Sequence, residues 1–317
     1  LNEVAFLGYL PPVNAMPALS TSPVEQPSYP AHLMVCPECQ LLQLSCIPDL
    51  DVVFPASYPY LSGMTRILRA NFADLAREAT MLTSGRVIDI GSNDGTLLKE
   101  FQKEGWQNVL GVEPTDAAKL ANVDRVPTTQ RPFDSLFVAD MLPDKAKLIT
   151  AANVFAHIPE PNAVVHDILS LLAPKGIFVS ENHYAVSTIA GLQWDTIYHE
   201  HLRYYSVTSL KHLLERHGLE IFDVKRIPSH GGSIRVWSAR KGDYPVKPSV
   251  ANFLGAEEVT LRKEVIDAFA GRIAHSKLNL MTTLFGAKFG GEQPARIFGI
   301  GAPSRATTLI NHCGIDH

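Results

Sequence analysis

The sequence predicts an α/β fold with a mostly parallel, doubly wound sheet, and three observations predict it. Short apolar runs typical of buried strands alternate with stretches of helical periodicity through the middle of the chain. The apolar run Val87–Ile90 ends in a turn rich in glycine, asparagine and aspartate, which leads into a helix pattern over Thr96–Phe101. An acidic residue, Glu113, follows where a second parallel strand would end. Strand, turn and helix in this order form the ligand-facing corner of a Rossmann-like sheet.

The other elements of the sheet follow from the same periodicities. A helix pattern over Thr65–Leu82 leads into the first strand. The further strands are predicted at Val109–Val112, Lys147–Ala152, Gly176–Glu181, Gly218–Val224 and Ser233–Ala239, with helices at Val164–Leu172 and Val207–His217. Because strands and helices alternate, most of the strands should be parallel.

The chain divides into three predicted parts. Residues 1–64 are proline-rich and poorly periodic, so we expect a small, loop-rich N-terminal lobe. Residues 65–245 hold the alternating strands and helices of the main domain. Residues 246–317 are predicted to form a helical linker and the start of a second, C-terminal α/β domain.

The third part has its own predicted elements. Lys241–Val250, with two prolines, is predicted as a linker, and Glu257–Ala287 as a long helical stretch. Arg296–Ile300 is predicted to be a strand that runs into another glycine turn and helix. Since the chain begins with Leu1 rather than Met and stops at His317 within this motif, we expect both ends to be shortened relative to the natural gene product.

Composition argues against several classes of protein. Of the 317 residues, 46% are hydrophobic, which is ordinary for a globular enzyme. The net charge of −4 gives no polybasic surface for nucleic acid or membrane, and no apolar run has the length of a membrane span. Four cysteines, two of them in a C-x-x-C pair, do not suggest a disulfide framework. We therefore expect a cytoplasmic protein with a small-molecule substrate.

The turn after Val87–Ile90 indicates which cofactor binds there. Dinucleotide sites use G-x-G-x-x-G, whereas this turn reads D-I-G-S-N-D-G, with acids on both sides of its glycines. Acids would repel a pyrophosphate but suit a cationic sulfonium, and the turn resembles the first motif of S-adenosylmethionine-dependent methyltransferases. The alternative is a strand–turn–helix that binds no ligand. The candidate cofactor-binding residues are Asp89, Gly91, Asn93, Gly95 and Glu113.

Groups able to transfer protons gather in the segment DTIYHEHLRYYS. Tyr198, His199, Glu200 and His201 are consecutive and supply a phenol, two imidazoles and a carboxylate. Histidine titrates near neutrality, a neighbouring glutamate can fix its tautomer, and a phenol can stabilise an enolate oxygen. The structural alternative is a polar surface loop or a buried hydrogen-bonded cluster. Four such groups on one short segment favour a catalytic role.

A second group of candidates follows the predicted strand Lys147–Ala152. Asn153 and His157, in ANVFAHIPEP, come after the carboxyl end of that strand, where α/β proteins bind ligands. Taken alone, Asn153 could cap the turn and His157 could be structural.

Together these motifs resemble one enzyme family. VIDIGSNDGTLL, ANVFAHIPEP, DTIYHEHLRYYS and SHGGSIRVW occur in the order seen in sugar-nucleotide C-methyltransferases, which methylate a carbon of a TDP-linked 4-keto-deoxysugar. The resemblance covers nearly the whole chain. It implies an N-terminal zinc-binding lobe, a central S-adenosyl-L-methionine-dependent methyltransferase domain and a C-terminal Rossmann-like domain. The segment Gly299–Ile315 resembles the opening of that last domain.

The resemblance to a zinc lobe rests on one cysteine pair. Cys36-Pro-Glu-Cys39 resembles the second half of the family's zinc motif, which uses two C-x-x-C pairs. Cys46 and Cys313 match neither pair. Because a closed structural site needs four ligands, the sequence leaves two outcomes open, a missing first pair upstream or no bound zinc.

The resemblance also implies roles for individual residues. Tyr198, Glu200 and His201 match the family's Tyr-x-Glu-His; either Tyr198 or His201 would be the base that forms an enolate, and Glu200 would orient it. In the segment SYPYLSG, which resembles one covering the substrate, Tyr60 is the better match and Tyr58 the alternative.

Three further residues complete the predicted site. Asn153 and His157 match positions that line the same cleft, and His230 would shape the floor of the sugar pocket or form a structural turn. Two other functions stay open: an O- or N-methyltransferase, and a non-catalytic protein that binds S-adenosylmethionine or a sugar nucleotide. The four proton-transferring groups argue against the non-catalytic protein.

Overall fold

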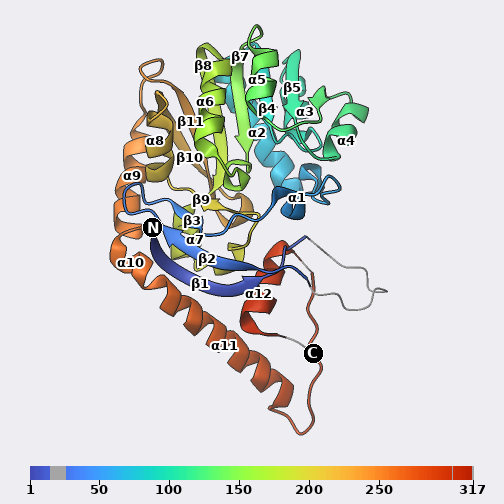
Figure 1. Cartoon of the computed structure of the whole chain (residues 1–317), viewed down its shortest axis with the longest axis vertical. Coiled ribbons are helices and arrows are strands. Elements are labelled where there is room, and N and C mark those ends of the chain that lie inside the picture. Colours follow the sequence, from blue (N-terminus) through green and yellow to red (C-terminus); the bar gives the residue numbers. More distant parts are fainter. Residues whose placement is uncertain (15–25, 302, 316–317) are drawn as a thin grey trace.

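A computed structural model of the chain describes residues 1–14, 26–301 and 303–315. It contains a seven-stranded and a four-stranded sheet, and a long helix that runs along one side of the smaller one (Figure 1). The N-terminal lobe expected over 1–64 includes residues 15–25, and the expected C-terminal part includes residues 302, 316 and 317; these lie outside the described residues. Within the described ranges, no helix is long and apolar enough to cross a membrane.

The seven-stranded sheet confirms the predicted α/β fold. Its order is β10–β11–β8–β7–β4–β5–β6, and every neighbouring pair is parallel except the two that β11 makes. The chain leaves β4 toward β5 on one side and later returns to β7 on the other, so ligands should bind between these strand ends. The strands are β4 (Arg86–Ile90), β5 (Asn108–Val112), β6 (Thr128–Thr129), β7 (Ala146–Ala152), β8 (Leu172–His183), β10 (Leu219–Ile227) and β11 (Ser233–Arg240).

Helices cover both faces of this sheet, which explains why its strands read as continuous apolar runs. In β4, Val87 packs in one hydrophobic cluster with α2 and α3, and Ile88 packs in the other with α5, α6 and α8. Thr65 caps α2 by accepting a hydrogen bond from the Leu68 N–H. The helices are α2 (Arg66–Leu82), α3 (Thr96–Lys103), α4 (Ala117–Val123), α5 (Ser135–Met141), α6 (Pro161–Leu171), α7 (Ala185–Ala190) and α8 (Val207–Glu215).

The N-terminal part is more regular than predicted. Instead of a loop-rich lobe, it forms a four-stranded antiparallel sheet of β1 (Asn2–Leu10), β2 (Tyr29–Val35), β3 (Leu42–Leu44) and β9 (Arg203–Tyr204), followed by the short helix α1 (Leu50–Val53). Two register shifts in β1 disturb the apolar alternation from which a strand is recognised. The last strand, β9, comes directly after the Tyr198–His201 segment and joins that segment to the N-terminal sheet.

The C-terminal part differs from the prediction in two places. The single helix predicted over Glu257–Ala287 is divided among α9 (Pro248–Thr260), α10 (Lys263–Asp267) and α11 (Phe269–Phe289). The strand predicted over Arg296–Ile300 is wrong, because none of the strands in the described part of the chain pairs with it. The helix predicted after it is present as α12 (Ser304–Cys313), which lies beside β1 (Figure 1).

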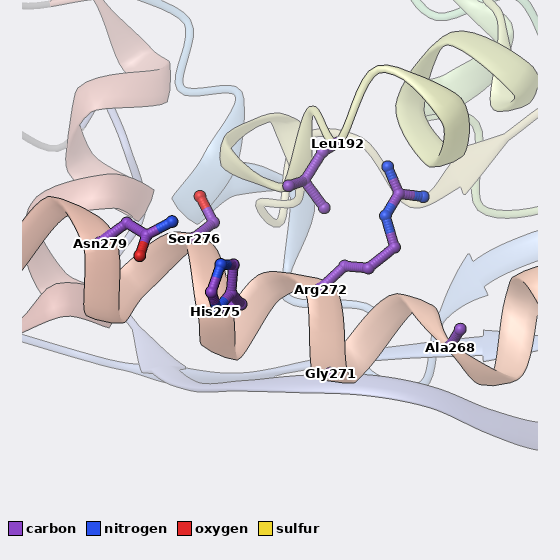
Figure 2. Close-up of a pocket in the computed structure, with 7 residues that line it drawn as sticks. All are labelled: Leu192, Ala268, Gly271, Arg272, His275, Ser276 and Asn279. Carbon is purple, nitrogen blue, oxygen red and sulfur yellow. The ribbon is translucent and has the colours of Figure 1, made fainter.

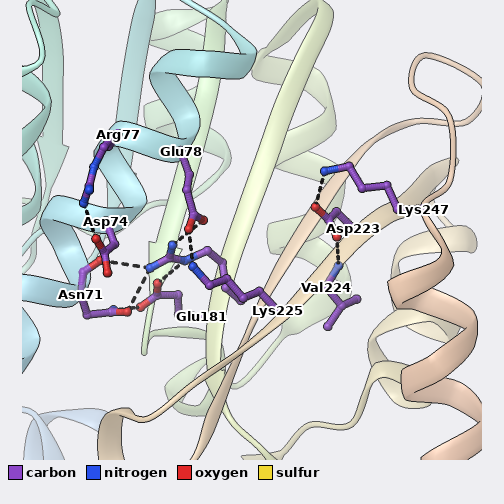
Figure 3. A network of polar contacts seen from close by, with 10 residues as sticks. Asn71, Asp74, Arg77, Glu78, Glu181, Asp223, Val224, Lys225 and Lys247 are labelled. Carbon is purple, nitrogen blue, oxygen red and sulfur yellow. Dashed lines mark hydrogen bonds and ion pairs between the residues drawn. The ribbon is translucent and has the colours of Figure 1, made fainter.

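A buried ion-pair network fixes α2 to the main sheet (Figure 3). We call Asn71, Glu78, Glu181 and Arg235 the closed network. The Arg235 guanidinium, fully buried in β11, donates to Glu181 Oε1 and to Glu78 Oε2, each at 2.7 Å. Asn71 Nδ2 donates to the other Glu181 oxygen at 2.7 Å. Each oxygen of the Glu181 carboxylate therefore has a partner, and one partner is a cation.

Candidate active site

Polar side chains lie at the carboxyl ends of four neighbouring strands. Asp89 is in β4, Glu113 directly follows β5, Asn153 directly follows β7 and His183 ends β8. Because these strands are parallel, their carboxyl ends meet at one edge of the sheet. The predicted cofactor turn and the predicted Asn153–His157 segment therefore lie at the same edge of the sheet.

The predicted cofactor turn needs its glycines. Gly91, Asn93 and Gly95 have φ of +66°, +51° and +74°, in the left-handed region that side chains disfavour. A Cβ on Gly91 would lie 2.5 Å from a methyl of Val154. The sharp turn and the close packing of β4 against the segment after β7 both depend on these residues.

Two buried carboxyl groups, those of Asp89 and Glu113, lie next to the turn. Glu113 Oε2 accepts from the Asn93 backbone N–H at 2.9 Å, and its Oε1 accepts from the Thr115 N–H at 2.8 Å. Asp89 accepts from the Thr150 hydroxyl at 2.6 Å, and burial raises the pKa of Asp89 to about 7. No lysine or arginine lies in 89–95 or 113–116. This set of carboxyl groups and amides fits a cofactor with a positive charge and ribose hydroxyls.

The SYPYLSG segment covers the turn. The Ser62 N–H donates to Asn93 Oδ1 at 2.9 Å, and the Gly63 N–H donates to Asp94 Oδ2 at 2.8 Å. Its two tyrosines go to different places. Tyr60 contacts the turn through its backbone carbonyl and its side chain is 38% exposed, whereas the Tyr58 hydroxyl donates to Glu200 Oε2 at 2.8 Å.

Glu200 is a buried carboxyl group with neutral donors. Besides Tyr58, Asn14 Nδ2 donates to its Oε1 at 2.5 Å. Burial raises the pKa of Glu200 to about 7, and the hydrogen bonds from Tyr58 and Asn14 oppose that shift. The carboxyl group can therefore exchange a proton near neutral pH.

The His201 ring is held so that one of its nitrogens carries no hydrogen and can accept a proton. Its Nδ1 lies 3.2 Å from the Thr196 carbonyl oxygen, which can only accept, so Nδ1 carries the hydrogen. Its Nε2 lies 3.4 Å from the Tyr198 hydroxyl. Burial lowers the pKa of His201 well below its usual value, so the ring is neutral at neutral pH. Burial raises the pKa of Tyr198, so that phenol keeps its proton.

Of the other histidines singled out in the sequence, His157 lies close to His201, whereas His199 points away from it. The His157 ring centre lies 5.2 Å from that of His201, and its Nδ1 meets the Glu200 backbone carbonyl. His199 turns away, with its Nε2 3.2 Å from the carbonyl of Pro30 in the N-terminal sheet. His230, with φ of +53°, occupies the tight turn before β11 and is exposed.

The structure adds residues that the sequence analysis did not single out. Asn14 contacts Glu200, and no pattern around Asn14 signals that contact. His183 ends β8, and a polar residue at the end of a predicted parallel strand could have been noticed. Burial, together with the charges of His230 and Arg305, lowers the pKa of His183 to about 4.

The cysteine pair does not form a metal site with other described residues. Cys36 and Cys39 flank the turn between β2 and β3. In the ranges that the structure describes, no group of three or more His, Cys, Asp or Glu side chains could hold a metal ion. The zinc implied by the sequence resemblance therefore has no support in this arrangement.

Family models match both halves of the chain. A model described as "Methyltransferase domain" matches residues 60–224, and one described as "C-methyltransferase C-terminal domain" matches residues 228–317. The C-methyltransferase NovU of Streptomyces niveus is 34% identical over 299 residues, which cover 91% of this chain and 70% of NovU.

More distant proteins match smaller shares of the chain. A ubiquinone biosynthesis O-methyltransferase of Erwinia tasmaniensis is 30% identical over 112 residues, which cover 32% of this chain and less than half, 44%, of that enzyme. Among solved structures, magnesium protoporphyrin IX methyltransferase of Synechocystis with bound SAH aligns with a TM-score of 0.44 and 13% identity, over 55% of this chain and 83% of that chain. A possible histamine N-methyltransferase of Thermotoga maritima aligns with a TM-score of 0.45 and 16% identity, over 56% and 90%.

Proposed function

The chain belongs to the S-adenosylmethionine-dependent C-methyltransferases, and from that premise we propose that it methylates a TDP-linked 4-keto-deoxysugar. The methyl group would go to a carbon beside the ketone, after a base has removed the proton from that carbon. The residues of the four sequence motifs, and the order of the motifs along the chain, support this substrate class. The buried, neutral groups around His201 support proton removal from carbon.

The cofactor would be held at the carboxyl ends of β4 and β5. When bound, S-adenosylmethionine supplies a methyl group on a sulfonium, which is already a strong electrophile. Glu113 would accept hydrogen bonds from ribose hydroxyls, since a carboxylate at this strand end is placed for that contact. Asp89, Gly91, Asn93 and Gly95 would shape the turn against the rest of the cofactor. The Tyr60–Gly63 backbone would close the turn from above.

One observation carries the proposed mechanism: the Thr196 carbonyl holds the His201 ring at Nδ1, and Nε2, which carries no hydrogen, is directed to the Tyr198 hydroxyl. A neutral imidazole whose Nε2 carries no hydrogen can accept a proton from carbon. Tyr198, which keeps its proton, is the poorer base of the two. We therefore assign the proton to His201 Nε2 and assign Tyr198 to donate a hydrogen bond to the oxygen that gains charge.

The remaining residues would position these two groups and the sugar. Glu200 binds Tyr58 through its side chain and His157 through its backbone carbonyl. It therefore positions residues on both sides of the group around Glu200 and His201. Asn153, His157 and His230 would contact the sugar from the strand ends and the turn before β11. Tyr58 extends from the covering segment into the cluster, so we place it, ahead of Tyr60, beside the substrate.

The test is the position of the transferred methyl group. A TDP-4-keto-deoxysugar is incubated with methyl-labelled S-adenosylmethionine, and carbon NMR locates the label in the product. We expect a carbon-bound methyl, with the rate reduced about 10²–10⁴-fold in His201→Ala, the usual cost of removing a general base. The matched control is His199→Ala, whose ring faces Pro30, and it should stay within a few-fold of wild type.

Two results would contradict the proposal. A label on oxygen or nitrogen would make the chain an O- or N-methyltransferase. Equal turnover in His201→Ala and wild type would remove the base assignment. Calorimetric binding of S-adenosylmethionine to His201→Ala confirms that this variant is folded.

A further inference from the structure

The Thr196 carbonyl determines how His201 is oriented, so what holds Thr196 in place matters for catalysis. That one oxygen accepts from His201 Nδ1 at 3.2 Å and from the Tyr204 hydroxyl at 2.9 Å. Thr196 belongs to a single turn of 3-10 helix, Trp194–Thr196, which carries little stability of its own. Its position must come from contacts with other elements.

Those contacts come from α12, near the C-terminal end of the described chain. Arg305 Nε and Nη2 donate to the two oxygens of Asp195 at 2.9 and 2.8 Å, which is a bidentate pair. One helical turn later, the Thr308 hydroxyl donates to the Ile197 carbonyl at 3.3 Å. The same helix therefore fastens the residue before Thr196 and the residue after it.

The residue before Arg305, Ser304, is linked to Glu200 through Asn14. The Ser304 hydroxyl lies 3.4 Å from Asn14 Oδ1, and Asn14 in turn donates to Glu200. Two consecutive residues of α12 are thus connected by hydrogen bonds to the two ends of the Asp195–His201 segment, Arg305 directly and Ser304 through Asn14.

The preceding helix, α11, supports the start of this segment (Figure 2). Arg272 donates to the carbonyls of Ile189 and Ala190, which end α7, at 2.9 and 3.1 Å. The Trp194 indole donates to the Ser276 hydroxyl at 3.2 Å. An open groove of about 520 Å³ lies beside these contacts, between α11 and Leu192. The chain before Asp195 is therefore anchored independently of Arg305.

We propose that Arg305, acting through Asp195, is a positioning residue for His201. It fixes the Thr196 carbonyl, and the carbonyl fixes the tautomer and direction of the imidazole. This inference rests on the proposed function of His201. Arg305 and Asp195 are 35% and 26% exposed, and an ion pair at such a surface contributes little to stability. Its main effect should be on geometry, where a misplacement of about 1 Å can cost up to ~10²-fold in rate.

A double-mutant cycle tests the proposal with Arg305→Met, Asp195→Asn and the double variant. Each single variant should lower kcat about 10–100-fold with KM for both substrates within about 3-fold of wild type. The double variant should be no slower than the slower single one, since both break one interaction. Lys263→Met is the control: it removes an ion pair with Asp267 on α10, and kcat should not change.

A second readout needs neither substrate nor cofactor. Nitrogen NMR of the free protein, with His201 assigned by comparison with His201→Ala, reports which ring nitrogen carries the hydrogen. We expect Nδ1 in wild type and a mixture of tautomers in Arg305→Met and Asp195→Asn. If Arg305→Met does not fold, the nearly isosteric Asp195→Asn carries both measurements.

Three outcomes would overturn the proposal. Additive losses in the double variant would mean that the two residues act separately. A raised KM with unchanged kcat would make Arg305 a substrate contact, and an unchanged His201 tautomer would break the link through Thr196. Failure of the proposed function is distinguishable, because it would appear as full activity in His201→Ala, whichever result Arg305→Met gives.

Discussion

Two buried carboxyl groups, Glu181 and Glu200, lie in opposite electrostatic settings. Glu181 is fully buried and faces the Arg235 guanidinium at 2.7 Å, with Asn71 on its other oxygen. Glu200 is 4% exposed, and its hydrogen-bond donors among the described residues, Tyr58 and Asn14, are neutral. Around it stand other neutral groups with long contacts, such as the 3.4 Å between Tyr198 and His201.

This difference in partners distinguishes a carboxyl group that stabilises the fold from one that can transfer protons. Burial raises the pKa of both carboxyl groups, but at Glu181 the charge of Arg235 opposes that rise and favours the anion. A carboxyl group among neutral donors keeps a pKa near neutrality, and its neighbours can exchange protons with a substrate. We infer that the closed network holds α2 on the sheet, whereas the cluster around Glu200 and His201 is built for proton transfer.

The largest expected effect is on the closed network. Arg235→Met would leave Glu181 buried without its cation and should lower the free energy of unfolding by about 3–5 kcal/mol. Urea denaturation measures this. Replacing Glu181 by Gln in the same chain should recover part of the loss, since it removes the unpaired charge.

The control for this prediction is a surface cation that pairs with one member of the closed network. Lys225 pairs with Glu78 but is half exposed, so Lys225→Met should cost no more than about 1 kcal/mol. Equal costs for Arg235→Met and Lys225→Met would contradict the distinction between a buried and a surface pair.

A smaller effect is expected from Glu200, and it depends on pH. The pKa of Glu200 is raised from 4.5 to about 7 in the folded chain, so between these values the folded state binds more protons than the unfolded state. The contribution of Glu200 to the stability of wild type therefore falls as pH rises through this window, and Glu200→Gln removes that contribution. Relative to wild type, Glu200→Gln should gain on the order of 2–4 kcal/mol between pH 4 and pH 8.

Unfolding curves at several pH values measure this difference, and any loss of hydrogen bonds in the variant cancels because it is the same at each pH. Parallel pH profiles of the variant and wild type would mean that Glu200 titrates normally, and the comparison with Glu181 would fail.

The main sheet could be predicted because its signals are local. Strands buried on both faces read as apolar runs, and β4 with its glycine turn is one continuous piece of sequence. The position of Glu257, within α9, could not be predicted, because it is set by tertiary contacts. Glu257 is fully buried and accepts from the Val207 N–H at 2.7 Å and the Tyr184 hydroxyl at 2.8 Å. Nothing in the helix pattern marks a charged residue as a partner of another helix.

The candidate site divides in the same way. The turn at Asp89–Gly95 and the Tyr198–His201 segment are recognisable as motifs, although the roles of their residues stay predictions. The contact of Asn14 with Glu200 joins residues 186 positions apart, and that of Arg305 with Asp195 spans 110 positions. The choice between Tyr58 and Tyr60 also depends on how the covering segment folds back. Such pairings follow from tertiary packing, which one sequence does not reveal.

Exchange of the substrate hydrogen with deuterated water tests the central claim most directly, because it isolates proton removal from methyl transfer. Wild type should exchange the hydrogen on the carbon beside the ketone of a TDP-4-keto-deoxysugar without S-adenosylmethionine. His201→Ala should lose about 10²–10⁴-fold of that rate, and His199→Ala should retain it. Exchange at the wild-type rate in His201→Ala would contradict the account, since the base would then lie outside the cluster around Glu200 and His201.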